Sequence, residues 1–577
     1  MKHYWKYIKP YIPYFIFGPL LMLTEVAGEI VLPKIMSEMI NVGIANADAA
    51  YILGRALKMI GFVCVMIIGG VGGHYLSIKA AVSFSADLRK DMFGKVQGFS
   101  FKNIDDFSTG SLVTRLTNDI TQMQNLIRMS LIMAMRAPGM LIGGLIMALS
   151  INKELATILL VVIPCLAVVI TILLRTGFPR FGIMQKKLDA LNSGIQENIT
   201  NVRVVKSFVR EKFEIEKFGK ANTDLMDTTL SALSIVVMTM PVMTLAMNIT
   251  TLLVVWNGGN LVINGGMQIG DLSAFTTYIV QILMSLMMLS MLIMQMSRAM
   301  ASSKRICEVL DTKADLSDDK SAHKDSVISN GKIEFKNVSF RYYKNRKENV
   351  LDNISFTINP GETVGIIGTT GSGKSSLVQL IPRLYDVNEG AVLIDGVDVR
   401  DYSLEHLRTA VGMVLQKNVL FSGTIKDNLK WGDENASDEE IFAAADSAQA
   451  HGFVESFTEG YNTELGQGGV NVSGGQKQRL CIARALLKKP KILILDDSTS
   501  AVDTATEAKI REAFRTSLKD STKIIISQRI NSVIEADKII VLEDGRISGI
   551  GTHEELMRSS GEYREIYSSQ TDMKEVS

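Results

Sequence analysis

Apolar residues concentrate in the first half of the chain, in runs too long for the core of a soluble domain. Positions 59–78 and 155–174 hold no Asp, Glu, Lys or Arg, and 228–270 and 272–297 are longer runs of the same kind. A helix needs about 20 apolar residues to cross the hydrocarbon core of a bilayer. The pattern predicts six membrane-spanning helices, at about 11–33, 59–78, 129–151, 155–174, 231–262 and 272–297.

The pattern changes after residue 301. Residues 302–330 are polar and charged, and we expect them to form a linker. From Lys332 onward, short β-branched segments such as Thr363–Ile367 alternate with helical stretches. This alternation predicts an α/β domain with a largely parallel sheet at 331–577. The expected fold class is therefore a multidomain membrane protein, with an all-α six-helix transmembrane domain at 1–301 followed by the α/β domain.

Charge indicates how the chain is oriented in the membrane. Lys and Arg are frequent in the loops at about 80–127 and 176–227, whereas 257–271 contains neither. By the positive-inside rule the basic loops are cytoplasmic, which places the N-terminus and the α/β domain in the cytosol. The net charge of +1 gives no indication of nucleic acid as a partner.

A glycine-rich loop follows the apolar strand that ends at Ile367. Such loops wrap nucleotide phosphates with backbone N–H groups, while Lys374 contacts the β- and γ-phosphates and the Ser375 hydroxyl binds Mg²⁺. The buried strand Lys491–Asp496 ends in a carboxylate, which in phosphate-loop (P-loop) NTPases holds the Mg²⁺. The α/β domain is therefore predicted to be a P-loop NTPase. Its predicted phosphate-binding residues are Gly368, Thr369, Thr370, Gly371, Ser372, Gly373, Lys374, Ser375 and Ser376.

The segment Val472–Gln476, with the sequence Val-Ser-Gly-Gly-Gln, resembles the signature of the ATP-binding cassette (ABC) family. In that family, amides of the signature contact the γ-phosphate of ATP bound to the opposite cassette. The resemblance covers about residues 332–570 and implies ATP and Mg²⁺ as cofactors. The further nucleotide contacts that it implies are Tyr342, as the adenine-stacking aromatic, and Gln416, Ser473, Gly474, Gly475, Gln476 and Asp503. The Mg²⁺ ligands that it implies are Ser375, Gln416 and Asp496.

The membrane half is similar to the six-span exporter type of the same family. The segments at 103–119 and 197–208 lie in the long cytoplasmic loops, which in this type carry the coupling helices that seat on the cassettes. The whole chain is most similar to the degenerate-site subunit of bacterial heterodimeric multidrug exporters of the Thermotoga type. This resemblance implies an ATP-driven, multi-pass exporter subunit of the bacterial cytoplasmic membrane.

Two positions of the cassette depart from the family pattern. Asp497 stands where the family has a catalytic Glu, and Gln528 where it has a His that contacts the γ-phosphate. Asp is one methylene shorter than Glu, and Gln cannot carry a proton or positive charge. We expect this chain's own site to bind ATP and hydrolyse it weakly. A partner half-transporter with Glu and His in place would form a competent site against the signature of this chain. The alternative is a slow but working site in a homodimer.

The cargo is less well specified by the sequence. Glu25 and Glu29 lie four residues apart within the first span, where carboxylates are costly and usually face a cavity or a partner. They are candidate ligands for cationic amphipathic substrates, or a structural pair bonded to neighbouring helices. Methionines crowd the last two spans, which suits a cavity that repacks around hydrophobic, drug-like compounds. Alternatives are a lipid, peptide or metal-chelate transporter of the same fold, and an ATP-gated regulator or channel.

Overall fold

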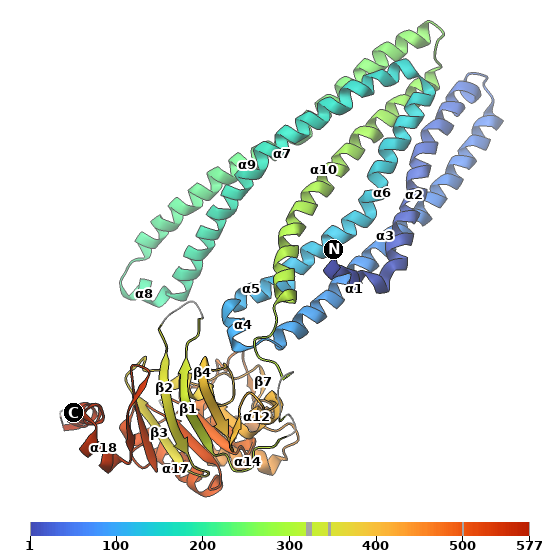
Figure 1. Ribbon diagram of the computed structural model, residues 1–577. Helices are drawn as coiled ribbons and strands as arrows, with labels where there is room; N and C mark the ends of the chain where they lie inside the picture. Colours follow the sequence, from blue (N-terminus) through green and yellow to red (C-terminus); the bar gives the residue numbers. More distant parts are fainter. Residues whose placement is uncertain (1, 319–322, 324–325, 344–347, 499–500, 576–577) are drawn as a thin grey trace. The chain divides into compact units, whose positions relative to one another are not determined.

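The computed structural model describes residues 2–318, 323, 326–343, 348–498 and 501–575 (Figure 1). The chain divides into two compact units. The first unit comprises Met1–Gln97 with Thr109–Asp311, and the second comprises Gly98–Ser108 with Thr312–Ser577.

Long helices make up the first unit. Within the described residues, six helical stretches are long and apolar enough to cross a membrane, which is the number that the sequence predicts. Their main helices are α2 (Ile12–Glu38), α3 (Ala49–Gln97), α6 (Ile120–Ile151), α7 (Lys153–Thr200), α9 (Glu211–Ile263) and α10 (Ile269–Asp311). Shorter elements are η1 (Lys2–Tyr4), α1 (Trp5–Ile8), η2 (Lys9–Tyr11), η3 (Met39–Ile44), α5 (Thr109–Thr114), η4 (Arg115–Asp119) and α8 (Val202–Ser207).

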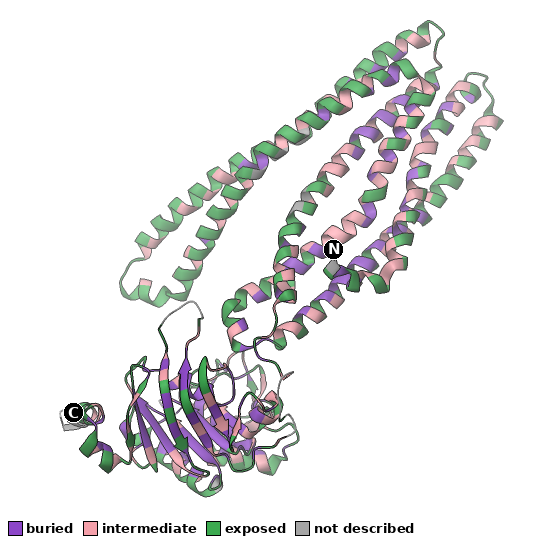
Figure 2. Cartoon of the chain, viewed as in Figure 1, coloured by how far each residue is buried: buried purple, intermediate pink, exposed green. Residues whose placement is uncertain are grey.

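Small residues let α2 and α3 pack closely. Gly73 of α3 is buried, and a Cβ there would lie 3.0 Å from the carbonyl oxygen of Gly18 on α2. Membrane helices, which gain no hydrophobic driving force against lipid, use such small residues to bring their backbones together. The opposite faces are apolar and exposed, as at Ile68 and Val71, and α7 and α9 are exposed along much of their length (Figure 2).

The predicted linker begins ten residues too early. Ser302–Asp311, expected to belong to it, is the end of helix α10. The Ser302 hydroxyl donates to Asp119 Oδ1 at 2.8 Å, and Arg305 Nε donates to Asp119 Oδ2 at 2.7 Å. Ile306 is buried on the same face of the helix. These residues looked like linker because they are polar, but their partners on η4 satisfy that polarity inside the helical unit.

In the described part of the second unit the strands form three sheets. The six-stranded sheet has the order β12-β11-β3-β10-β9-β6 and is parallel except at β12. Its strands are β3 (Thr363–Gly368), β6 (Val411–Val414), β9 (Ile492–Asp496), β10 (Thr522–Ile526), β11 (Lys538–Glu543) and β12 (Arg546–Gly551). An antiparallel sheet, which the sequence pattern did not indicate, has the order β2-β1-β4-β5. Its strands are β1 (Ile333–Phe340), β2 (Leu351–Ile358), β4 (Glu389–Ile394) and β5 (Val397–Asp398); β7 (Gly423–Thr424) pairs with β8 (Glu464–Leu465).

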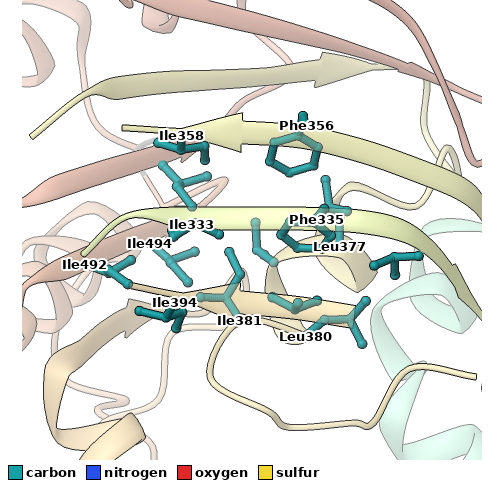
Figure 3. Close-up of a cluster of buried hydrophobic side chains, with 14 of the residues drawn as sticks. Ile333, Phe335, Phe356, Ile358, Leu377, Leu380, Ile381, Ile394, Ile492 and Ile494 are labelled. Atoms are coloured by element: carbon teal, nitrogen blue, oxygen red, sulfur yellow. The ribbon is translucent and has the colours of Figure 1, made fainter. Parts of the chain in front are cut away.

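A hydrophobic core joins the two larger sheets. Phe335 of β1 and Phe356 of β2 stack with ring centroids 4.5 Å apart, and Ile494 of β9 and Leu377 of α11 (Lys374–Gln379) belong to the same buried cluster (Figure 3). Every residue of β9 is buried, as expected for a central strand of a parallel sheet. The core therefore holds the carboxyl end of β9, at Asp496, in a fixed place.

A second buried cluster builds a helical lobe on the same unit. In the described part of the unit, the helices that follow α11 are α12 (Leu404–Ala410), α13 (Ile425–Leu429), α14 (Asp438–Ser447), α15 (His451–Glu455), η5 (Gly460–Asn462), α16 (Gly474–Leu487), α17 (Thr504–Ser517), η6 (Ile530–Ser532), α18 (His553–Ser559) and α19 (Gly561–Glu575). Helix α16 begins at the signature segment and carries much of this cluster.

The short helix α4 (Phe101–Asp106) belongs to the second unit rather than to the membrane domain predicted at 1–301. Asn103 of this helix accepts the backbone N–H of Asp315 at 3.1 Å. Lys102 pairs with the Asp315 carboxylate at 3.2 Å. The helix is fastened to the linker by these contacts between residues more than 200 positions apart, which hydrophobic periodicity does not reveal.

Candidate nucleotide-binding site

The glycine-rich loop lies at the same edge of the six-stranded sheet as the carboxylate that ends β9. Strands β3 and β9 both run parallel to β10, which lies between them. Their carboxyl ends therefore meet at one edge of the sheet, where α/β proteins bind ligands. The loop that follows β3 and the carboxylate that ends β9 are brought to the same edge in this way.

Glycine is required at two positions of the loop. A Cβ at Gly368 would lie 2.0 Å from the carbonyl oxygen of Leu542, so the close approach to β11 excludes any side chain. Gly373 has φ of 96°, in the left-handed region that other residues rarely adopt. Gly373 is also the N-cap of α11, so the chain turns there into the helix.

Lys374 and Ser375 point toward the phosphate-binding loop and the sheet. Lys374 Nζ donates to the carbonyl oxygens of Gly368 at 2.8 Å and Thr369 at 2.7 Å. Burial lowers the pKa of Lys374, and the Asp497 and Asp496 carboxylates oppose that shift. The Ser375 hydroxyl donates to Asp496 Oδ1 at 3.0 Å. Burial raises the pKa of Asp496, and this hydrogen bond opposes the shift.

A cavity of about 220 Å³ gathers ten of the predicted residues. Its lining includes Gln416, Asp496, Asp497 and Gln528 together with six residues of the loop, which are Thr370, Gly371, Gly373, Lys374, Ser375 and Ser376. The predicted loop residues Gly368, Thr369 and Ser372 are not part of this lining. The paired Ser375 and Asp496 oxygens are ligands that Mg²⁺ prefers, and Lys374 supplies positive charge for phosphate. The donor set therefore fits Mg²⁺ and a nucleotide phosphate chain. Gln416 follows β6 and Ile526 ends β10, so the ends of four strands, β3, β6, β9 and β10, contribute to one cavity.

Asp497 has a constrained backbone. Its φ is 47°, in the left-handed region, which Asp tolerates better than most residues. Its backbone N–H donates to the carbonyl oxygen of Ile526 at 3.0 Å. Burial raises the pKa of Asp497, and the positive charges of Arg529 and Lys374 oppose the shift. The short carboxylate is thus anchored at the sheet edge by its own backbone.

Gln528 lies on a segment that the C-terminal helix holds. Gln570 of α19 donates from Nε2 to the carbonyl oxygen of Gln528 at 2.7 Å, and its Oε1 accepts the backbone N–H of Ile530 at 2.9 Å. One glutamine thus fixes the backbone on both sides of Arg529. Sequence reasoning missed this residue, because nothing in the local sequence of α19 distinguishes Gln570 from a surface glutamine.

The signature segment does not line the cavity of this chain. Ser473 and Gly474 are exposed at the start of α16. The Ser473 hydroxyl accepts the backbone N–H of Gln476 at 3.3 Å, and Gln476 Oε1 accepts the backbone N–H of Ser473 at 2.9 Å. This capping box leaves the segment ordered and accessible.

Two further predicted contacts also lie outside the cavity lining. Asp503 is the N-cap of α17 and accepts the backbone N–H of Thr506 at 2.9 Å, which lowers the pKa of its carboxyl. Ser500, in the same loop, lies outside the described residues. Tyr342 follows β1, and its hydroxyl is 2.8 Å from Ser376 Oγ at the start of α11. Tyr342 is therefore next to the phosphate loop.

The intramembrane carboxylates have a partner that sequence reasoning missed. Arg136 of α6 donates to Glu25 Oε1 at 2.9 Å and to Glu29 Oε1 at 2.6 Å, both on α2. Gln281 of α10 donates to the backbone carbonyl of Glu29 at 3.0 Å. The geometry favours the structural interpretation of Glu25 and Glu29, in which they join neighbouring helices. Arg136 lies within the predicted span 129–151, and its charge there was the available signal.

Comparisons with known proteins agree with this architecture. Residues 15–286 match the family described as ABC transporter transmembrane region, and residues 351–500 the family described as ABC transporter. The chain is 44% identical over 567 residues to the uncharacterized ABC transporter ATP-binding protein YfiB of Bacillus subtilis (strain 168), covering 98% of this chain and 97% of YfiB. The putative multidrug export ATP-binding/permease protein YgaD of that strain is 34% identical over 594 residues, with 99% of each chain covered. A solved structure of a bacterial Atm1-family ABC exporter with ATP bound matches at a TM-score of 0.81 and 25% identity, covering 97% of this chain and 98% of that one.

The chain therefore belongs to the ABC transporter family. It is a half-transporter of the exporter type, in which a helical six-span membrane domain is fused to an α/β ATP-binding cassette. This confirms the predicted fold class. The cassette of such a protein is an ATPase whose activity is coupled to transport.

Proposed function

We propose that this chain is one subunit of a heterodimeric exporter that moves hydrophobic, drug-like compounds outward by alternating access. The observation that carries the proposal is the cavity at the sheet edge, which gathers an unaltered phosphate loop with Asp497 and Gln528. Binding groups are retained there, while the two positions that the family uses for hydrolysis are changed. The site is therefore suited to hold ATP rather than to turn it over.

Within this site, Lys374 binds the β- and γ-phosphates and Tyr342 stacks on adenine. Ser375 and Asp496 hold Mg²⁺, directly or through water, and Gln416 completes the ligand set. Bound Mg²⁺ neutralises charge on the phosphate oxygens. Asp497 is the shortened counterpart of the catalytic Glu, and its carboxylate falls short of the attacking water by roughly 1.5 Å, the length of one methylene. Gln528 donates a hydrogen bond to the γ-phosphate but cannot carry positive charge.

The exposed signature serves the partner's site. Amides at the start of α16 form an anion-binding helix N-terminus, and Ser473 and Gly474 leave it accessible to a second cassette. A partner half-transporter with catalytic Glu and His then completes one competent ATP site per complex. Gly475 and Gln476 continue the same contact surface, and Asp503 belongs to the adjoining loop.

The substrate class rests on separate observations. YgaD, a relative over nearly the whole chain, is described as a putative multidrug export protein. The Met-rich final spans suit varied hydrophobic ligands. A lipid, peptide or metal-chelate cargo is the second candidate, and an ATP-gated regulator or channel the third. We place the protein in the bacterial cytoplasmic membrane, with its N-terminus and cassette in the cytosol.

The test is co-expression with a neighbouring half-transporter gene, followed by purification in lipid nanodiscs. We expect ATPase activity to need both chains, with turnover of this chain alone lower by about 100-fold, the usual cost of a misplacement of about 1 Å. Robust turnover by this chain alone would contradict the asymmetric pair. Uphill transport of a hydrophobic dye into vesicles that contain both chains separates a pump from a channel.

A further inference from the structure

Tyr385 lies between the nucleotide-binding face of the cassette and helix α4. Its hydroxyl donates to Asp105 Oδ2 of α4 at 2.8 Å. Its ring lies 6.2 Å from the ring of Phe101, which is also on α4. All three residues belong to the second unit of the chain. Burial and the hydrogen bond to Asp105 raise the pKa of Tyr385, so the hydroxyl stays protonated as the donor.

The ring of Tyr385 also meets the ring of Tyr342. The two rings lie 5.1 Å apart and nearly perpendicular, at 88°, an edge-to-face arrangement that fixes one ring against the other. Phe340 packs against both rings, at 4.9 Å from Tyr342 and 5.7 Å from Tyr385. The Tyr342 hydroxyl in turn contacts Ser376, next to the Mg²⁺ ligand Ser375. A continuous set of contacts thus joins α11 to α4.

We propose that Tyr385 is a positioning residue that links adenine occupancy at Tyr342 to helix α4 through its hydrogen bond with Asp105. A base stacked on Tyr342 restricts that ring, the edge-to-face contact restricts Tyr385, and the hydrogen bond passes the restriction to α4. Linkage is reciprocal, so a change on α4 alters the affinity for the base by the same factor. The proposal rests on the proposed function, in which Tyr342 stacks on adenine.

The test compares two probes on the full-length chain in nanodiscs, MgATP and magnesium tripolyphosphate. Both engage the phosphate loop, and only ATP carries a base. We expect Tyr385→Phe and Asp105→Ala each to weaken MgATP binding about fivefold, the effect of one hydrogen bond, and to leave tripolyphosphate binding unchanged. The double variant should lose no more than either single variant, because both remove the same bond.

Tyr402→Phe is the matched control. It removes a buried tyrosine hydroxyl of the same cassette, which donates to the carbonyl oxygen of Ile394 at 3.0 Å and lies outside this set of contacts. Equal losses for both probes, additive losses in the double variant, or an equal effect of Tyr402→Phe would overturn the proposal. Tyr342→Ala separates the two levels of inference. If Tyr342→Ala leaves the ratio of the MgATP and tripolyphosphate affinities unchanged, the proposed adenine site is wrong. If Tyr342→Ala changes this ratio but the variants at Tyr385 and Asp105 do not, only the link through Tyr385 is wrong.

Discussion

At the scale of the residue, the nucleotide site combines unaltered binding groups with two altered ones. Lys374 donates to two backbone carbonyls of the loop, and Ser375 donates to Asp496. Asp497 adopts a left-handed backbone conformation, so the position is tied to a tight turn whatever its side chain. A catalytic side chain restored there would start from the same backbone anchor, because the N–H of Asp497 remains bonded to Ile526.

Restoring the family residues tests this directly. We expect Asp497→Glu with Gln528→His to raise ATP turnover of this chain at least about tenfold, because the longer carboxylate regains its reach and His supplies a protonatable donor. The measurement is phosphate release by the chain alone and with its partner. Asp496→Asn in the restored background is the control and should abolish the gain. No gain with intact MgATP binding would mean that other residues limit hydrolysis.

At the scale of the element, polar contacts decide how helices are joined. Arg136 ties α6 to two carboxylates of α2, and all three side chains are largely withdrawn from solvent. Removing one partner of a buried ion pair lowers the free energy of unfolding more than removing all of its charged partners together, because it leaves a charge uncompensated. This asymmetry separates a structural role of Glu25 and Glu29 from a substrate-binding one.

Arg136→Gln is therefore expected to destabilise the helical unit by about 3 kcal/mol, and the triple variant with Glu25→Gln and Glu29→Gln by less. The thermal midpoint of the purified chain in detergent provides the measurement, with Arg128→Gln on the same helix as the control. If the variant with Glu25→Gln and Glu29→Gln is stable and loses only the export of cationic dyes, the carboxylates instead bind the substrate.

The hydrogen bonds between Gln570 of α19 and the backbone next to Arg529 are a second example of polar contacts that join two elements. Gln570→Ala removes two hydrogen bonds to backbone groups, each worth about 1 kcal/mol. We expect amide hydrogen exchange at 527–532 to accelerate about tenfold, as the segment opens more often. Ser569→Ala, the neighbouring position of α19, is the control and should leave exchange unchanged. Equal exchange in both variants would show that packing, and not Gln570, holds the segment.

At the scale of the whole molecule, the exposed signature supports the proposed pairing with a second cassette. Ser473 and Gly474 are exposed and absent from the lining of the chain's own cavity. An ordered helix N-terminus of this kind binds an anion when a second cassette presents one. The co-expression experiment therefore tests a property of the assembled complex. Its outcome depends on two chains and cannot be inferred from the turnover of one.

The sequence by itself determined the features carried by contiguous residues. The apolar runs predicted six spans because crossing a bilayer demands uninterrupted length, and the spacing of Gly368–Ser375 after a buried strand predicted the phosphate loop. Asp497 and Gln528 were likewise recognised from the sequence, as single positions that differ from the family pattern. Local physical constraints of this kind leave their signal within a few neighbouring positions.

Only the tertiary structure decided the features carried by residues far apart in the chain. Arg136 meets Glu25 and Glu29 across more than 100 positions, Gln570 reaches Gln528 across 42, and Asp105 meets Tyr385 across 280. The linker boundary at Asp311 depended on Asp119, whose carboxylate holds Ser302 within α10. Polar residues look alike along the chain whether they face water or a distant partner, and only folding shows which of them are paired.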